Sequence, residues 1–531
     1  MHAMKKQPAS HQERYGYLWL ALGLILSLFA TNGRWDIPIA AWLYPLFFLR
    51  FTRISRPFIG FCGIWLSSIV AMFFFFYQSQ LLNPLITIAC LFFSTVLSLP
   101  YLLDRLLAPR ISVASGLLTT LIFPLGRVVC EYLVSSTPFG SLFSLAYTQY
   151  DNLPLLQLLS ITGIYGVSFL MAWFASVGNG IWEQHFAWPR IRKAALLYGT
   201  LLALTLIGGS IRLAFFPPLA QTVRVAGISV GTTTRQTLLQ QRRNFTTKEQ
   251  LTNADLSPLR AAFALNNEDL FTRSQREARA GAKIIVWPEA AALTMVEDEA
   301  KLVERGKTLA RQEQIYLEMG LVVVQYKASS LPALHDRSIL LDPQGNVVWT
   351  YDKAHPIPGM ESFAAGDGVV PTVDTPYGRL ANVICFDGDF LDLMRQGGSK
   401  QVDMMLVPSN DWQGIDPMHT QHIAFRAIEN GYSLVRQTSN GLALTVDYQG
   451  HILAASDYFT TNEQTMIAFV PKKGVTTIYA LVGDLFAWLC IASLLSLTGF
   501  VILRSIQSRR KVSAPATTPT NAGDKVETGI L

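Results

Sequence analysis

The chain has 531 residues, of which 50% are hydrophobic and only 15% are charged, and its formal net charge is +6. So few charges exclude an ordinary soluble protein, and part of the chain is expected to have lipid as its solvent. A basic balance can indicate nucleic-acid binding. Here, however, lysines and arginines cluster beside apolar runs, as residues that flank membrane spans do. We therefore predict a membrane protein that does not bind nucleic acid.

Eight apolar stretches follow one another, each close to the roughly 20 residues that a helix needs to cross a bilayer. They cover residues 15–32, 35–50, 57–78, 82–103, 112–134, 156–182, 194–216 and 476–504. The connections between them alternate between basic segments and segments with few basic residues, and both ends of the chain are basic. The positive-inside rule then predicts that both termini are cytoplasmic. The first stretch lacks a cleavage pattern and is expected to be a retained anchor.

The apolar stretches divide the chain into four expected parts. Residues 1–216 form a membrane domain of seven helices, residues 476–504 the eighth transmembrane helix, and residues 505–531 a disordered cytoplasmic tail. The remaining segment, 217–475, would lie outside the cytoplasm and is long enough for one domain with its own core.

Within 217–475, short β-like runs alternate with stretches that carry apolar residues at helical spacing. This pattern favours a layered α/β domain. Two Gly-containing segments, Asp342–Asn346 and Asp447–Gly450, are typical of hairpin turns. The predicted strands are Val223–Ile228, Lys283–Val286, Ile315–Val324, Ser338–Leu341, Asn346–Tyr351, Leu380–Ile384, Met404–Val407, Ser433–Gln437 and Ala443–Asp447, and the predicted helices are Ser257–Ala280, Val296–Gln312 and His419–Glu429.

Three polar residues at or near strand ends are candidates for chemistry: Glu289, Lys353 and Cys385. Cys385 lies outside the apolar stretches that hold the other four cysteines, and it precedes a Gly-containing polar turn, which suits a nucleophile. Each residue also has a structural interpretation. Cys385 could be a small buried apolar residue, Glu289 a helix cap and Lys353 a solvated surface lysine.

Together the three residues resemble the nitrilase superfamily, whose catalytic set is Glu, Lys and Cys in this chain order. The spacings are 64 and 32 residues, and the motifs are Trp287-Pro288-Glu289, Tyr351-Asp352-Lys353-Ala354-His355 and Ile384-Cys385. The resemblance also implies that Glu361 matches a second glutamate that helps to position the lysine and the cysteine.

The apolar part narrows the resemblance to the apolipoprotein N-acyltransferase family. The supporting segments are Trp42–Pro45, Pro138–Gly140, Leu145–Gln149, Gly163–Phe169 and Gly483-Asp484. The resemblance implies an αββα sandwich on a membrane domain of about eight helices. It also implies a bacterial inner-membrane location, a periplasmic catalytic domain, and no cofactor or metal.

The expected chemistry is acyl transfer through a thioester on Cys385. No ATP or acyl-CoA is expected outside the cytoplasm, so a membrane phospholipid ester is the available acyl donor. Glu289 would take the thiol proton, and Lys353 would stabilise the developing oxyanion. The acceptor would be the α-amino group of the N-terminal cysteine of a diacylglyceryl lipoprotein. Nothing demands more than a monomer.

The chain departs from the family pattern directly after the cysteine. Phe386-Asp387 stands where relatives carry Tyr-Glu, and these two residues, with Glu361, are expected to position the catalytic groups or the substrate. No segment matches the family's substrate-side tryptophan early in the domain. The thioester chemistry is therefore better supported than the identity of the acceptor.

Three other interpretations remain open. The protein could be a membrane-bound nitrilase-type amidase or an acyltransferase with a different acceptor, or it could be a non-catalytic binding module. Alternatively, His419 and His422 could bind a metal from one helix face, with His335 or His355 as a further ligand. Finally, Arg127 and Glu131 are spaced to pair within the fifth apolar stretch, as a structural pair or as a lipid headgroup contact.

Overall fold

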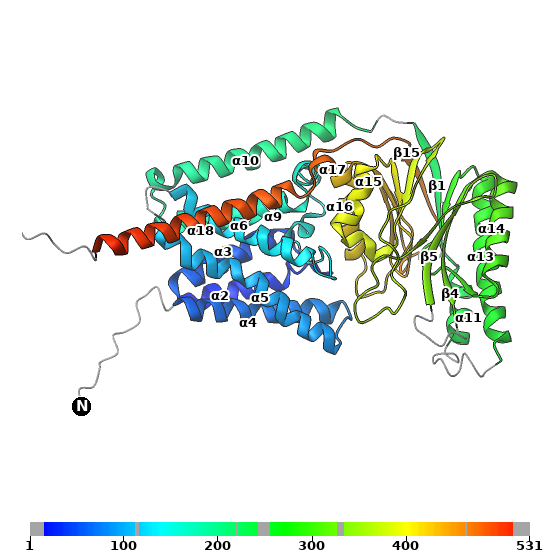
Figure 1. The fold of residues 1–531 in the computed structure, drawn as a ribbon, viewed down its shortest axis with the longest axis horizontal. Coiled ribbons are helices and arrows are strands. Elements are labelled where there is room, and N and C mark those ends of the chain that lie inside the picture. The colour runs from blue at the N-terminus through cyan, green and yellow to red at the C-terminus, as the bar shows by residue number, and fades with distance from the viewer. Residues whose placement is uncertain are drawn as a thin grey trace, which may run out of the picture.

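The structure is a computed structural model, and it describes residues 15–111, 116–218, 221–242, 255–325, 334–461 and 465–512. It has two parts side by side (Figure 1). One is a bundle of helices, and the other contains two large β-sheets with helices on both outer faces, together with a small two-stranded sheet. Residues 1–14 and most of the predicted tail, from 513 onwards, lie outside the described residues.

Each of the eight predicted stretches contains a helix. Six described helices are long and apolar enough to cross a membrane. The first two stretches form shorter helices, α2 (Gly16–Leu28) and α3 (Pro38–Ile54), with 13 and 17 residues. The six longer helices are α4 (Pro57–Gln78), α5 (Pro84–Leu107), α6 (Gly116–Ser135), α9 (Ile164–Glu183), α10 (Trp188–Phe215) and α18 (Leu485–Val512).

Two predicted spans are interrupted where a glycine adopts a positive φ. Gly163 (φ +63°) separates α8 (Leu159–Thr162) from α9, and Gly483 (φ +60°) separates α17 (Ile478–Val482) from α18. A Cβ atom on Gly163 would lie 2.5 Å from the ring of Tyr479, so the two interrupted segments pack together at this point. The prediction of continuous spans there is wrong, because apolar composition does not reveal a left-handed backbone.

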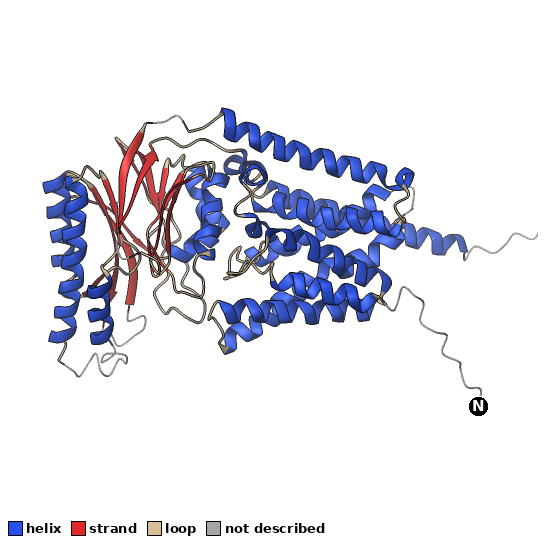
Figure 2. Cartoon of the chain, turned by 180° about the vertical axis from the view of Figure 1, so that it is seen from behind, coloured by secondary structure: helices blue, strands red, loops and turns tan. Residues whose placement is uncertain are grey.

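The second part is the predicted αββα sandwich (Figure 2). Among the described residues, the first sheet has the order β15-β1-β2-β4-β5-β6, with β3 paired to β4, and the second has the order β14-β13-β11-β9-β8-β7. The strands are β1 (Thr222–Ile228), β2 (Ile284–Val286), β3 (Ala292–Met295), β4 (Tyr316–Val324), β5 (Leu334–Leu341), β6 (Val347–Asp352), β7 (Thr372–Thr375), β8 (Gly378–Asn382), β9 (Met404–Leu406), β11 (Ser433–Arg436), β13 (Leu442–Val446), β14 (Ile452–Asp457) and β15 (Thr465–Pro471).

Both predicted hairpins are confirmed. Strand β5 pairs antiparallel with β6, and β13 pairs antiparallel with β14. Strands β3, β7, β14 and β15 were not predicted, nor were the two-residue strands β10 (Ser409–Asn410) and β12 (Thr438–Ser439). Strand β7 alternates between partly buried and exposed residues, and β14 shows no fully buried position, so neither carries a strong apolar signal. Strand β15 joins the sheet by pairing with β1, far away in the sequence.

Helices cover the outer face of each sheet. Helices α11 (Thr232–Arg242), α13 (Ser257–Arg279) and α14 (Glu299–Glu313) lie on the side away from the membrane helices, whereas α15 (Leu391–Ser399) and α16 (Met418–Asn430) lie between the second sheet and the helical bundle (Figure 1). Phe425 and Ile428 of α16 belong to the same buried cluster as Leu159 of the bundle. The backbone N–H of Ile164 also donates to Glu429 Oε1 at 2.9 Å. The second sheet is thereby fixed against the membrane helices.

Candidate active site

The structure brings the three predicted residues together at the ends of strands from both sheets. Glu289 follows β2, Lys353 follows β6, and Cys385 begins a short 3₁₀ helix after β8. Their exposed fractions are 4%, 0% and 1%. Lys353 Nζ donates to Glu289 Oε1 at 2.7 Å. The interpretation of Lys353 as a solvated lysine is therefore wrong. Glu289 caps no helix either, because the segment after it turns into β3.

The backbone of Cys385 has an unusual conformation. Its φ is +47°, in the left-handed region that non-glycine residues rarely adopt. The N–H of Cys385 donates to the carbonyl of Pro408 at 2.9 Å, and Sγ lies 4.0 Å from the carbonyl oxygen of Asn410. The neighbouring strand ends therefore hold the residue in this conformation. Backbone strain that a fold maintains in this way is typical of functional sites.

Glu361 lies where the resemblance implies. Both of its carboxylate oxygens accept from Lys353 Nζ at 2.9 Å, and Oε2 also accepts from the N–H of Ile357 at 2.8 Å. The ammonium of Lys353 is thus held between Glu289 and Glu361. A fourth group, Asp336 of β5, lies 3.8 Å from Lys353 Nζ, and the sequence did not single it out.

Asp387 is fully buried and ties the cysteine segment to the lysine segment. Its carboxylate accepts from Tyr351 Oη at 2.8 Å, from the N–H of His355 at 2.8 Å and from the N–H of Ile384 at 3.1 Å. It therefore orients the two segments. Phe386 packs edge to face against Phe390, with ring centroids 5.3 Å apart, and lines an apolar chamber.

The electrostatics of the site keep the proton on the thiol in the resting state. Burial, and then the charge of Glu289, raise the pKa of Cys385 well above its usual range. Burial acts to raise the pKa of Glu289 too, but Lys353 and nearby hydrogen bonds outweigh it, so the net shift is downward. The carboxylates around Lys353 overcome its burial and raise its pKa. The site thus contains a neutral thiol, an ionised base and a fixed cation.

A second buried charge network adjoins the cysteine. The Nδ1 of His419 is 2.9 Å from Asp411 Oδ1, and its Nε2 is 2.8 Å from Asp389 Oδ2. Arg436 also donates to both oxygens of Asp411 at 2.9 Å. Burial disfavours the charged imidazole, but the two carboxylates dominate and raise the pKa of His419 to about 9.

We expect this network to make the folded protein less stable at alkaline pH. The pKa of His419 in the folded protein, about 9, exceeds the ordinary value of 6.5 for a histidine in the unfolded chain. Its contribution is therefore complete below pH 6.5 and is lost as the pH rises through about 9. Thermal unfolding of the wild-type protein and of His419→Gln, measured between pH 6 and 9.5, tests this expectation. The Tm of the wild-type protein should fall as the pH rises, whereas the Tm of His419→Gln should fall much less. An equal fall in both proteins would contradict the expectation.

The histidines of the alternative metal-site interpretation do not form a ligand group among the described residues. Both nitrogens of His419 face carboxylates, and the ring of His422 stacks on Tyr147 at 4.2 Å. His355 stacks on Phe390 at 3.5 Å, and His335 contacts Gln325. Two other described groups bring possible ligand atoms within 4.8 Å of one another: Cys385 with Asp411 and His419, and Glu289 with Asp336 and Glu361. In the second, the ammonium of Lys353 already occupies the place of a cation.

An apolar chamber lies near Cys385, since one of its lining residues, His419, has a ring nitrogen within 4.8 Å of Cys385 Sγ, and the sequence did not predict it. It is formed where the ends of membrane helices α4 and α5 meet the loops of the sandwich. Phe386 and His419 connect it to the site. Its other lining residues are Phe75, Phe76, Leu81, Ile86, Phe139, Leu142, Ile357, Pro358, Met360, Asp389, Trp412, Ile415 and Met418.

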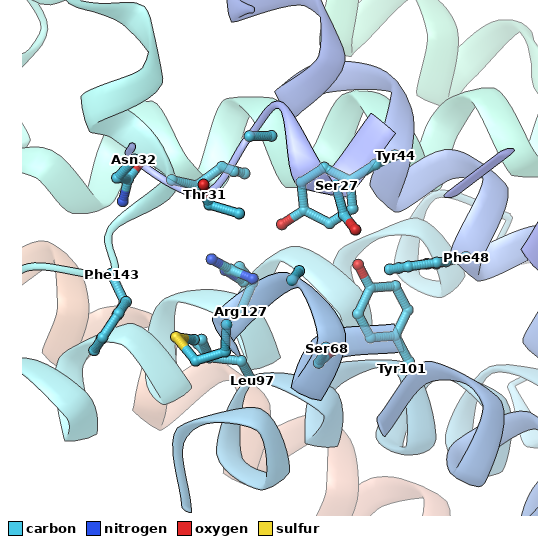
Figure 3. Close-up of a pocket in the computed structure, with 14 residues that line it drawn as sticks. Ser27, Thr31, Asn32, Tyr44, Phe48, Ser68, Leu97, Tyr101, Arg127 and Phe143 are labelled. Carbon is cyan, nitrogen blue, oxygen red and sulfur yellow. The ribbon is translucent and has the colours of Figure 1, made fainter. Parts of the chain in front are cut away.

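Arg127, which pairs with Glu131, lines a separate small cavity of the helical bundle. Figure 3 shows Arg127 directed into this cavity, with Tyr44 and Tyr101 on its wall. Arg127 Nε donates to Glu131 Oε1 at 2.6 Å, and the hydroxyl of Ser144 donates to Glu131 Oε2 at 3.0 Å. Because the carboxylate fixes the loop after α6, the arrangement supports the structural interpretation of the pair.

The αββα sandwich with a buried Glu–Lys–Cys set defines a nitrilase-type protein joined to a membrane domain. The carbon-nitrogen hydrolase family model matches residues 235–479, and the model of the apolipoprotein N-acyltransferase N-terminal domain matches residues 17–177. An apolipoprotein N-acyltransferase of Geobacter metallireducens is 30% identical over 75% of each chain. One of Haemophilus influenzae is 25% identical over 73% of this chain and 75% of its own.

The chain therefore belongs to the apolipoprotein N-acyltransferase family, and it is a membrane enzyme of lipoprotein N-acylation. Among solved structures, an amidase of Nesterenkonia sp. is similar, with 17% identity and a TM-score of 0.36, over 48% of this chain and 92% of that chain. The family assignment rests on the sequence relatives.

Proposed function

We propose that Cys385 accepts an acyl chain from a membrane phospholipid and passes it to the N-terminal cysteine of a diacylglyceryl lipoprotein. The observation that carries this proposal is the apolar chamber beside Cys385. A chamber lined by aromatic and aliphatic side chains suits a hydrocarbon chain. Because α4 and α5 contribute to its wall, the chamber lies between the membrane helices and the site, which supports a donor drawn from the membrane.

The first half-reaction forms the thioester. Glu289 removes the proton from Sγ, the thiolate attacks the ester carbonyl, and the S–C bond forms as the ester C–O bond breaks. Lys353 stabilises the negative charge that develops on the carbonyl oxygen, because a preorganised cation in a dry site acts without reorganisation. Glu289 then returns its proton to the departing lysophospholipid oxygen.

The second half-reaction transfers the chain. The α-amino group of the acceptor attacks the thioester carbonyl, the N–C bond forms, and the C–S bond breaks. Glu289 accepts the amine proton and passes it to the sulfur, which restores the starting enzyme. Two half-reactions at one site give ping-pong kinetics.

We also propose the orientation and the domain limits that the sequence predicts. Arg53, Arg105 and Arg110 lie near the ends of α3 and α5 that point away from the sandwich. Their distribution supports cytoplasmic termini and a periplasmic catalytic domain in a bacterial inner membrane. The proposed membrane domain is 1–216 with the eighth helix at 476–504, the proposed catalytic domain is 217–475, and the proposed assembly is a monomer.

Filling the chamber tests the proposed donor. Ile415, which is 5% exposed, lines the chamber. We expect Ile415→Trp to lower kcat/KM for donors with long acyl chains about tenfold more than for short-chain donors, since a filled pocket excludes added methylenes. Product analysis with a lipopeptide acceptor measures this. Leu66→Trp, on an exposed position of α4, is the control.

Equal losses for all chain lengths would contradict the role of the chamber. Release of free fatty acid without N-acylated lipopeptide would instead indicate that water is the natural acceptor, as in an amidase.

A further inference from the structure

Three carboxyl groups surround the single ammonium of Lys353 inside the protein, and they differ sharply in how they are satisfied. Glu361 receives three hydrogen bonds, two from Lys353 and one from a backbone N–H. Glu289 Oε1 receives one bond from Lys353. Within the described ranges, three of these oxygens accept no hydrogen bond: both oxygens of Asp336 and Oε2 of Glu289.

These unpaired oxygens are deeply buried. The exposed fraction is 2% for Asp336 and 4% for Glu289. One oxygen from each of Glu289, Asp336 and Glu361 lies within 4.8 Å of the others. If all three groups were ionised beside one lysine, the cluster would carry a net charge of −2 away from water. Burying unpaired charges is strongly unfavourable, and like charges at close range force one group to keep its proton.

We propose that Asp336 is protonated in the resting enzyme and donates a hydrogen bond to Glu289 Oε2. One proton then satisfies the unpaired oxygen of Glu289 and one oxygen of Asp336, and the charge of the cluster falls to −1. Asp336 is the member that holds the proton because it has the fewest donors. The groups that face it are Glu289 after β2, Lys353 after β6 and Glu361 in the following loop. Burial, then the charge of Glu289, raise the pKa of Asp336 in the same sense.

Asp336 is thus a positioning residue for the base. Its hydrogen bond fixes the Glu289 carboxylate and favours the ionised form, which the removal of the thiol proton requires. The backbone of Asp336 acts in the same direction, since its carbonyl accepts from the N–H of Lys353 at 3.0 Å. Asp336 of β5 therefore holds both Glu289 and Lys353 in place beside Cys385.

Two variants distinguish a neutral donor from a charged group. Asp336→Ala removes the donor, and we expect it to lower kcat about 10- to 100-fold, as expected for a lost hydrogen bond to a charged group. Its acid limb should move to higher pH, because Glu289 loses a donor that favours ionisation. Asp336→Asn keeps a neutral donor of the same shape. It should therefore retain most of the wild-type activity, and the acid limb of its pH profile should match that of the wild-type protein.

The inference rests on the proposed role of Glu289, so it also needs a readout that is independent of activity. Infrared spectra of the full-length protein in H₂O and D₂O should contain a band from a protonated buried carboxylic acid. We expect Asp336→Asn to remove one such band, and the control Glu361→Gln to retain it. If the Asp336→Asn spectrum keeps every protonated-carboxyl band, or if Asn is as inactive as Ala, Asp336 is ionised and the inference is wrong. If Asp336→Asn removes the band but the wild-type protein has no acyl-transfer activity, the inference stands and only the proposed function is contradicted.

Discussion

Replacing Cys385 by alanine is expected to lower lipoprotein N-acylation by roughly 10⁴-fold or more, because removing the nucleophile abolishes the covalent route. The side chain is buried in a pre-formed site, and Ala fits in the space of the thiol. The folded protein should therefore survive, and the loss should be in kcat. The measurement is formation of N-acylated lipopeptide from phospholipid by the purified enzyme in detergent or vesicles.

The matched control is Cys62→Ala, at a partly exposed cysteine of α4. It should keep wild-type activity and the same thermal stability. If Cys385→Ala retained more than a few per cent of the activity of Cys62→Ala, no obligatory thioester could form on this residue.

Replacing Glu289 by glutamine is the second large change, and we expect kcat to fall about 10²–10⁴-fold, the usual contribution of a general base. Gln has the shape of Glu and can still accept a hydrogen bond from Lys353, but it cannot take the thiol proton. Since burial raises the pKa of Cys385, the thiol stays neutral without this base. The activity that remains should increase with pH as the thiolate forms unaided.

Glu304→Gln, an exposed position of α14, is the control for the charge change. The role of Glu289 is contradicted if its variant keeps normal single-turnover acylation of Cys385 at neutral pH.

Most of the fold could be predicted because its signals are local. Apolar runs of the length of a bilayer located the helices α4, α5, α6 and α10, and Gly-containing turns between apolar runs located two hairpins. The breaks at Gly163 and Gly483 could not be predicted, since each depends on a left-handed backbone next to a distant partner. Strand β15 depends on pairing with β1, about 240 residues away, which no local pattern encodes.

The candidate site also contains residues that the sequence could predict and residues that it could not. Glu289, Lys353, Cys385 and Glu361 could be predicted because each belongs to a recognisable motif. Asp336 has no motif. The available signal was its parity on β5, where it shares one face with Ser338 and Leu340 and so points inward despite its charge. The chamber could not be predicted either, because it combines side chains from membrane helices with loops that are distant in the sequence.

The role of Asp387 could not be predicted from the sequence either. As a substitution next to the cysteine, it suggested a change in substrate recognition. In the structure its carboxylate is fully used by Tyr351, His355 and Ile384. It orients the segment that carries Lys353, whereas Phe386, which lines the chamber, is the one of the pair that can contact an acyl chain.

Thioester formation on Cys385 can be observed directly in the intact mass of the purified protein after incubation with phospholipid and no acceptor. We predict a mass gain of one acyl group, located on the peptide that contains Cys385, sensitive to hydroxylamine and absent from Cys385→Ser. Adding a diacylglyceryl lipopeptide should then remove the acyl group and yield N-acylated product. A protein that forms product while never carrying an acyl group on Cys385 would contradict the account.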